Sequence, residues 1–74
     1  MKTYYYQLKT GLLFSTTQDI YFTQQGYCID KQAITPEDSF ISGEIHLPGI
    51  AQPRSVQDMS FRSTDVVATW EETN

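Results

Sequence analysis

Cysteine, basic residues and long apolar runs are all scarce in this sequence. Cys28 is the only cysteine, so no disulfide can form within the chain, and a single thiol is more typical of a reducing compartment than of a secreted framework. The longest apolar runs are three residues, as at 12–14, whereas a membrane-spanning helix needs about 20. The first residues also lack the apolar centre of a signal peptide. The sequence therefore predicts a cytoplasmic protein without a membrane segment.

Positive charge is scarce as well. Five Lys and Arg stand against nine Asp and Glu, which gives a net charge of −4 at pH 7. Nucleic-acid binding needs Lys and Arg clustered against phosphates, and the five cations here are scattered along the chain. We therefore expect no nucleic-acid partner. A modest acidic charge of this size favours solubility.

Aromatic and other hydrophobic residues, by contrast, are plentiful. They make up 14% and 39% of the chain respectively, and disordered chains are poor in them. The length of 74 residues predicts a single small domain over residues 1–74. A domain of this size buries only ~60% of the surface that its unfolded chain exposes, so one copy alone is marginally stable and self-association is a common remedy.

Two-residue alternation of apolar and polar side chains runs through the sequence and predicts strands. The clearest run is 3–9, where Tyr4, Tyr6 and Leu8 share one side. We expect strands over 3–9, 12–17, 20–24, 27–30, 40–47, 55–61 and 65–71. Thr35-Pro36 predicts at most one helical turn near residues 35–39. A loop is expected over 50–54 and a solvated tail over 71–74.

The predicted fold class is all-β: a single small, strongly bent antiparallel barrel or β-roll of about six strands. A flat sheet of this size would leave one face unprotected, so it must curl. Residues 65–71 also fit a short helix, but two adjacent valines favour a strand. The expected core consists of Tyr4, Tyr6, Leu8, Phe14, Ile20, Phe22, Ile29, Ile41, Ile45, Leu47, Phe61, Val66 and Trp70.

Few residues could carry catalysis or hold a cofactor or a metal. Cys28 and His46 are the only thiol and imidazole, and a structural zinc site needs about four ligands. The glycines are dispersed and form no phosphate-binding loop. We therefore predict no catalytic set, no cofactor and no metal. The enzyme alternative is a nucleophilic pair of Cys28 with His46; the favoured interpretation gives Cys28 a packing role and places His46 at the surface.

An uncharged aromatic face is the strongest functional signal. If Tyr4 and Tyr6 face the core, Tyr5 faces outward, and the same alternation turns Leu13 and Tyr21 outward. Tyrosine suits interfaces because it combines a large apolar body with a hydroxyl. The predicted interface comprises Tyr5, Leu13, Tyr21, Thr3, Gln7 and Thr23.

These observations predict a small non-catalytic interaction module that binds a protein partner or a second copy of itself, as a homodimer. The alternative is a ligand-binding module that stacks a base or a sugar on Tyr5 and Tyr21. Aromatic platforms of that kind on small β-barrels are accompanied by a basic groove, and three lysines are the only cations in the first 34 residues.

Overall fold

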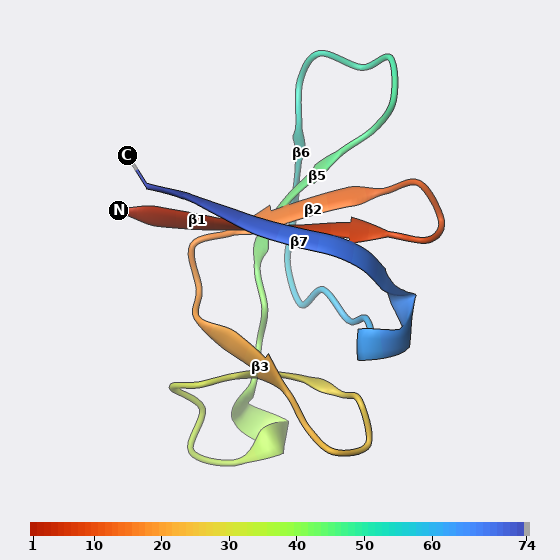
Figure 1. Cartoon of the computed structure of the whole chain (residues 1–74). Coiled ribbons are helices and arrows are strands. Elements are labelled where there is room, and N and C mark those ends of the chain that lie inside the picture. Colours follow the sequence, from red (N-terminus) through yellow and green to blue (C-terminus); the bar gives the residue numbers. More distant parts are fainter. Residues whose placement is uncertain (74) are drawn as a thin grey trace.

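The computed structural model describes residues 1–73, in which the regular elements are strands and two helical turns (Figure 1). The elements in chain order are β1 (Lys2–Leu8), β2 (Leu13–Thr16), β3 (Ile20–Phe22), β4 (Cys28–Asp30), η1 (Pro36–Asp38), β5 (Gly43–His46), β6 (Arg54–Val56), η2 (Ser63–Asp65) and β7 (Val66–Thr73). The all-β class is confirmed. The expected helical turn is also present, with Pro36 at its first position.

The strands form two sheets. One has five strands in the order β6-β5-β2-β1-β7, and the other is the β3-β4 hairpin. All pairs are antiparallel. In the sequence the hairpin lies between β2 and β5, which are neighbours in the larger sheet. In space it packs against one face of that sheet (Figure 1). The result is a bent β-roll rather than a closed barrel, and β1 and β7, from opposite ends of the chain, lie side by side.

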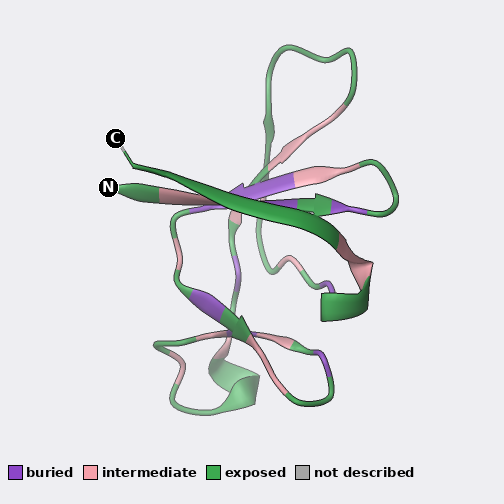
Figure 2. Ribbon diagram, in the orientation of Figure 1, coloured by how far each residue is buried: buried purple, intermediate pink, exposed green. Residues whose placement is uncertain are grey.

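The core lies between the two sheets (Figure 2). Phe14 on β2 is completely buried. The rings of Tyr6, Phe14, Phe22 and Phe61 contact one another with centroids 5.5 to 6.4 Å apart, a spacing typical of favourable aromatic pairs. Most of the expected core is therefore correct: the buried members are Tyr6, Leu8, Phe14, Ile20, Ile29, Ile41 and Phe61, and Tyr4, Phe22, Ile45 and Val66 pack against them.

Trp70 was expected in the core, and this prediction is wrong: its side chain is 41% exposed. The reason is a bulge in β7, where Leu8 pairs with Val66 but the preceding Gln7 pairs with Ala68. The extra residue reverses the alternation. Val66 therefore faces the core, whereas Ala68 and Trp70 face away from it.

Several expected boundaries also differ from the structure. The strand expected over 40–47 is confined to β5 at Gly43–His46, and the strand expected over 20–24 ends with β3 at Phe22. The strand expected over 55–61 is confined to β6 at Arg54–Val56, so Arg54 belongs to a strand and not to the expected loop. β7 continues through Thr73, where a solvated tail was expected; residue 74 lies outside the described residues. Leu47, which was expected in the core, is only half-buried.

Neither helical turn within residues 1–73 has the length and apolar character needed to cross a membrane.

Candidate functional site on the outer face of the sheet

One face of the five-stranded sheet covers the core, and the opposite face, called the outer face below, is open. Strand register determines which side chains share it, because directly paired residues lie on the same side. Tyr5 pairs with Ser15 and Trp70, and Ser15 pairs in turn with Glu44. The strand residues on the outer face are Thr3, Tyr5, Gln7, Leu13, Ser15, Glu44, His46, Ser55, Ala68, Trp70 and Glu72.

A stacked aromatic pair dominates this face. The rings of Tyr5 and Trp70 are nearly parallel, at 5°, with centroids 5.2 Å apart. The indole Nε1 of Trp70 lies 3.4 Å from an Oε2 of Glu72, which directs the N–H along the strand. Such stacking fixes both rings and leaves little side-chain entropy to lose on binding. The pair is therefore a rigid, partly exposed apolar platform.

His46 extends the platform on the other side of Tyr5. Its ring centroid lies 6.5 Å from that of Tyr5. His46 Nε2 shares a hydrogen bond of 2.9 Å with Ser15 Oγ, and Ser15 is only 5% exposed although it faces outward. Because serine is small, β2 leaves room for the two rings to approach each other across it. The result is a continuous row of Trp70, Tyr5 and His46 over four strands.

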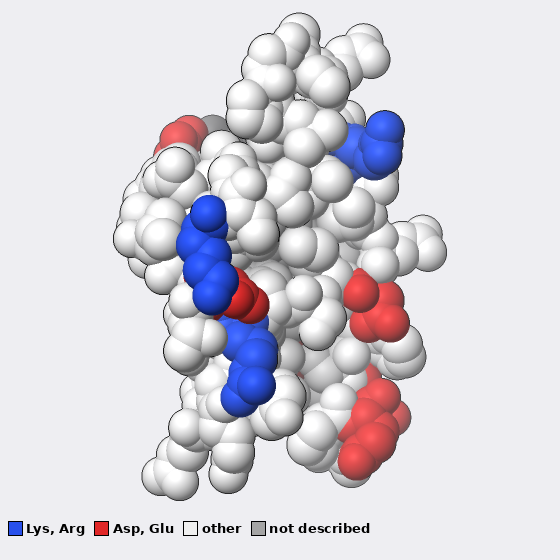
Figure 3. Space-filling view, turned by 90° about the vertical axis from the view of Figure 1, so that its right-hand side faces the viewer, with Lys and Arg blue, Asp and Glu red and all other residues white. Residues whose placement is uncertain are grey.

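Charge is sparse on the outer face. Its strand residues include Glu44 and Glu72 but no Lys or Arg. On the side of the molecule shown in Figure 3, which is the right-hand side of Figure 1, an acidic side chain lies between basic ones, other acidic side chains lie apart from them, and most of the surface is uncharged. Depletion of charge around exposed aromatic residues is typical of the centre of protein interfaces.

No protein-family model, curated protein or solved structure matched the chain. Function is therefore inferred from geometry. Four of the six predicted interface residues lie on the outer face: Thr3, Tyr5, Gln7 and Leu13. Tyr21 lies on β3 in the other sheet and Thr23 in the turn that follows, so these two do not share this face. Alternation predicts which side of its strand a side chain lies on, but not which sheet that strand joins.

Sequence reasoning missed the contribution of Trp70 and underrated that of His46. The bulge at Gln7/Leu8 put Trp70 on the outer face, and a bulge has no reliable signal in one sequence. His46 did have a usable signal, because the alternation of 40–47 already placed it away from Ile45. The register of β5 against β2 then brings it beside Ser15.

The structure does not form the Cys28–His46 pair. His46 lies on the outer face, whereas Cys28 packs against the core on the other side of the sheet. Burial, with a smaller contribution from the nearby Asp30 carboxylate, raises the pKa of the Cys28 thiol to about 12. The thiolate is the nucleophilic form of cysteine, so this thiol is placed for packing.

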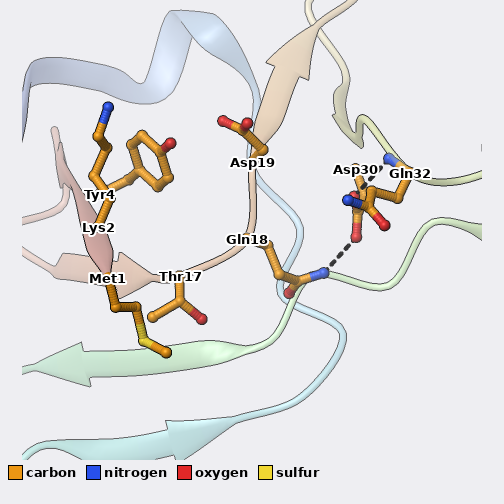
Figure 4. Close-up of a pocket in the computed structure, with 8 residues that line it drawn as sticks. All are labelled: Met1, Lys2, Tyr4, Thr17, Gln18, Asp19, Asp30 and Gln32. Carbon is orange, nitrogen blue, oxygen red and sulfur yellow. Dashed lines mark hydrogen bonds between the residues drawn. The ribbon is translucent and has the colours of Figure 1, made fainter.

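A polar crevice of about 360 Å³ lies between the start of β1 and the β3-β4 hairpin (Figure 4). Asp30 accepts a hydrogen bond of 2.5 Å from Gln18 Nε2, and Asp19 lies 3.9 Å from Lys31 Nζ. The Tyr4 hydroxyl points toward Asp19, and their hydrogen bond raises the pKa of Tyr4. Both carboxylates are thus already engaged by this chain, and within residues 1–73 no three metal-binding side chains come together. The outer face is the stronger candidate site.

Proposed function

We propose that this chain is a non-catalytic protein-interaction module that binds through the outer face of its five-stranded sheet. The observation that supports the proposal is the partly exposed, parallel stack of Tyr5 on Trp70 among outer-face strand residues that include no Lys or Arg. Interface centres are rich in aromatic residues and poor in charge. Leu13 and His46 extend the contact beyond the stack.

The size of the platform is sufficient for a specific contact. Covering Trp70, Tyr5 and Leu13 contributes on the order of 3–6 kcal/mol before the costs of association. Because the two rings already support each other at 5.2 Å, little ordering of side chains is needed on binding.

The alternative of stacking a base or a sugar required Tyr5 and Tyr21 in one site. These residues belong to different sheets, and the strand residues of the outer face offer no cation for a phosphate. A protein partner is therefore the better-supported ligand class.

The test compares three forms of the tagged chain as bait: wild type, Leu13→Lys and Ile50→Lys. Leu13 lies on the outer face, whereas Ile50 is an exposed apolar residue of the β5-β6 turn, at 56% exposure, and so controls for the added lysine. A captured protein, this chain itself included, is then purified and titrated against all three forms. We expect Leu13→Lys to weaken binding at least tenfold and Ile50→Lys to leave it unchanged. Equal affinity for all three forms would overturn the proposal.

A further inference from the structure

The β7 edge of the large sheet has no strand beside it among residues 1–73. β1 pairs with one side of β7, and the strand order ends there. Every β7 residue after Val66 is exposed along the strand (Figure 2). An open edge carries a row of unpaired N–H and C=O groups that can accept another strand. β6, the opposite edge, is only three residues long and follows Pro53 directly, which makes it a poor template.

Most of the regular part of β7 lacks the features that usually protect an edge, and its charges are confined to Glu71 and Glu72 near the C-terminal end. Residues 68–73 contain no Pro and no Lys. The bulge is confined to the N-terminal end, at Val67, which is 61% exposed. Six residues of regular edge therefore remain for pairing.

The charges near the two ends of β7 favour a second copy of this chain in antiparallel orientation. At the N-terminal end, Lys9 Nζ lies 3.5 Å from the Asp65 carboxylate, and the Arg62 side chain is close enough to act on the same carboxylate electrostatically, so positive charge is in excess. At the C-terminal end, the side chains of Glu71 and Glu72 outnumber that of Lys2. Antiparallel pairing of two copies brings the positive end of each toward the negative end of the other. Parallel pairing would instead place Glu71 and Glu72 beside their own copies, which is unfavourable.

Symmetry then restricts the register. A twofold axis perpendicular to the sheet keeps both outer faces on one side, so it must lie midway between one β7 residue and the same residue of the other copy. Below, an axis at a residue means the axis between that residue and its copy. An axis at Glu71 sets two like charges directly opposite each other, and an axis at Thr69 sets Glu71 against the bulged Val67. An axis at Trp70 sets Thr69 opposite Glu71 and Ala68 opposite Glu72, so no like charges are paired and the bulged Val67 falls opposite only Thr73, the last residue of the strand.

We propose that β7 joins two copies of this chain, paired antiparallel about Trp70, so that their five-stranded sheets form one continuous sheet. This inference goes beyond the proposed function, because the β7 edge is a contact surface separate from the outer face. The two outer faces become continuous, and the Tyr5–Trp70 stack of one copy meets that of the other at the axis. The interaction platform is thereby doubled in size.

Disulfide trapping tests the register. Thr69→Cys and Glu71→Cys are made separately in a Cys28→Ala background; both positions are exposed. Directly paired residues have Cα atoms about 4.5–5.5 Å apart, within the range of a disulfide, whereas diagonal ones are about 7–8 Å apart. Under mild oxidation we expect the mixture of the two proteins to form the mixed disulfide in at least tenfold excess over either protein alone, as measured by intact mass. Ser55→Cys on the β6 edge is the matched control and should remain monomeric.

Each outcome has a distinct meaning. A Thr69→Cys protein that traps itself would indicate either parallel pairing or an antiparallel axis at Thr69, and both would overturn the proposal. A mass of 8.5 kDa by light scattering for the wild type at 100 µM and below, with no mixed disulfide, would also overturn it. If trapping fails while Leu13→Lys still abolishes capture of a different protein, the outer-face function stands and the second copy is excluded. If trapping succeeds and Leu13→Lys changes no binding, the edge contact stands and the outer-face function fails.

Discussion

At the scale of single residues, Gly43 is the position where the fold tolerates least. A Cβ atom there would overlap the carbonyl oxygen of Ser15 and lie 3.0 Å from two ring carbons of Phe14, which is completely buried. The backbone oxygen cannot move without disturbing the β2-β5 pairing. We expect Gly43→Ala to lower the free energy of unfolding by about 3 kcal/mol, as overpacking does, measured by urea denaturation.

Gly11→Ala is the matched control for this prediction. Gly11 has a φ of +95°, but its added Cβ would meet nothing within 4 Å. Only the left-handed backbone strain remains, which costs about 1 kcal/mol. Equal losses for the two variants would show that the close approach at Gly43 is relieved in solution.

Asp65 gives the fold a defined pH dependence. Its Oδ2 accepts a hydrogen bond of 3.0 Å from the Arg62 N–H, and Lys9 Nζ lies 3.5 Å from Oδ1. The Arg62 hydrogen bond, followed by Lys9, lowers the pKa of Asp65 below its ordinary 3.8. A carboxyl group whose pKa is lower in the folded than in the unfolded state stabilises the fold at a pH above its pKa in the unfolded state. This stabilisation is lost as the pH falls through the pKa of the folded state.

Asp65→Asn should therefore unfold at lower urea than the wild type at pH 7. The difference in midpoint should shrink as the pH falls below about 3.8. Glu37→Gln, at an exposed position in η1, controls for the loss of one negative charge. A difference that stays constant from pH 7 to pH 2.5 would contradict the assignment.

At the scale of elements, the Gln18 side chain makes hydrogen bonds to the backbone before β5 that a neighbouring strand would otherwise make. Its Nε2 donates to the Phe40 carbonyl at 2.9 Å, and its Oε1 accepts from the Ser42 N–H at 2.6 Å. The amide thus pairs with this segment as a peptide group would. The same Nε2 also donates to Asp30, so one side chain connects the end of β2, the start of β5 and the β3-β4 hairpin.

Gln18→Leu keeps the volume but removes these hydrogen bonds. We expect a loss of about 1–2 kcal/mol in the free energy of unfolding, because the Phe40 and Ser42 backbone groups lose their partner. Gln52→Leu, at an exposed position of the β5-β6 turn, should change stability by less than about 0.5 kcal/mol. A similar effect of both variants in urea denaturation would show that the bridge contributes nothing.

The same scale shows what the sequence could and could not predict. Alternation located β1 to β5 because each of these strands has side chains in or against the core, and it also located β7, although every β7 residue after Val66 is exposed. Gly11 marked the first turn through its positive φ. The sheet to which each strand belongs was not predictable. The alternation around Tyr21 is the same whether β3 extends the large sheet or forms a separate hairpin. The outward position of Trp70 depended on one bulged residue, which a two-residue period cannot reveal.

At the scale of the whole molecule, the longest strand pairing joins the two ends of the chain. Lys2 pairs with Thr73, so β1 and β7 close a loop of nearly the full length (Figure 1). Closing such a loop costs chain entropy and slows folding. A circular permutant that joins residue 74 to Met1 by a short Gly-rich turn, and opens between Gly49 and Ile50, converts this pairing into a hairpin. Only the three-residue β5-β6 pairing becomes long-range in return.

We expect this permutant to fold on the order of tenfold faster than the parent chain, because the entropy of closing the large loop is removed. Stopped-flow fluorescence of Trp70, the only tryptophan, measures the rate. A second permutant with the same linker, opened instead between Thr10 and Gly11, makes the four-residue β1-β2 register long-range and should lose most of the gain. A first permutant that folds no faster than the parent chain would mean that β1-β7 closure does not limit folding. The ends of the chain would then meet only after the β2-centred core has formed.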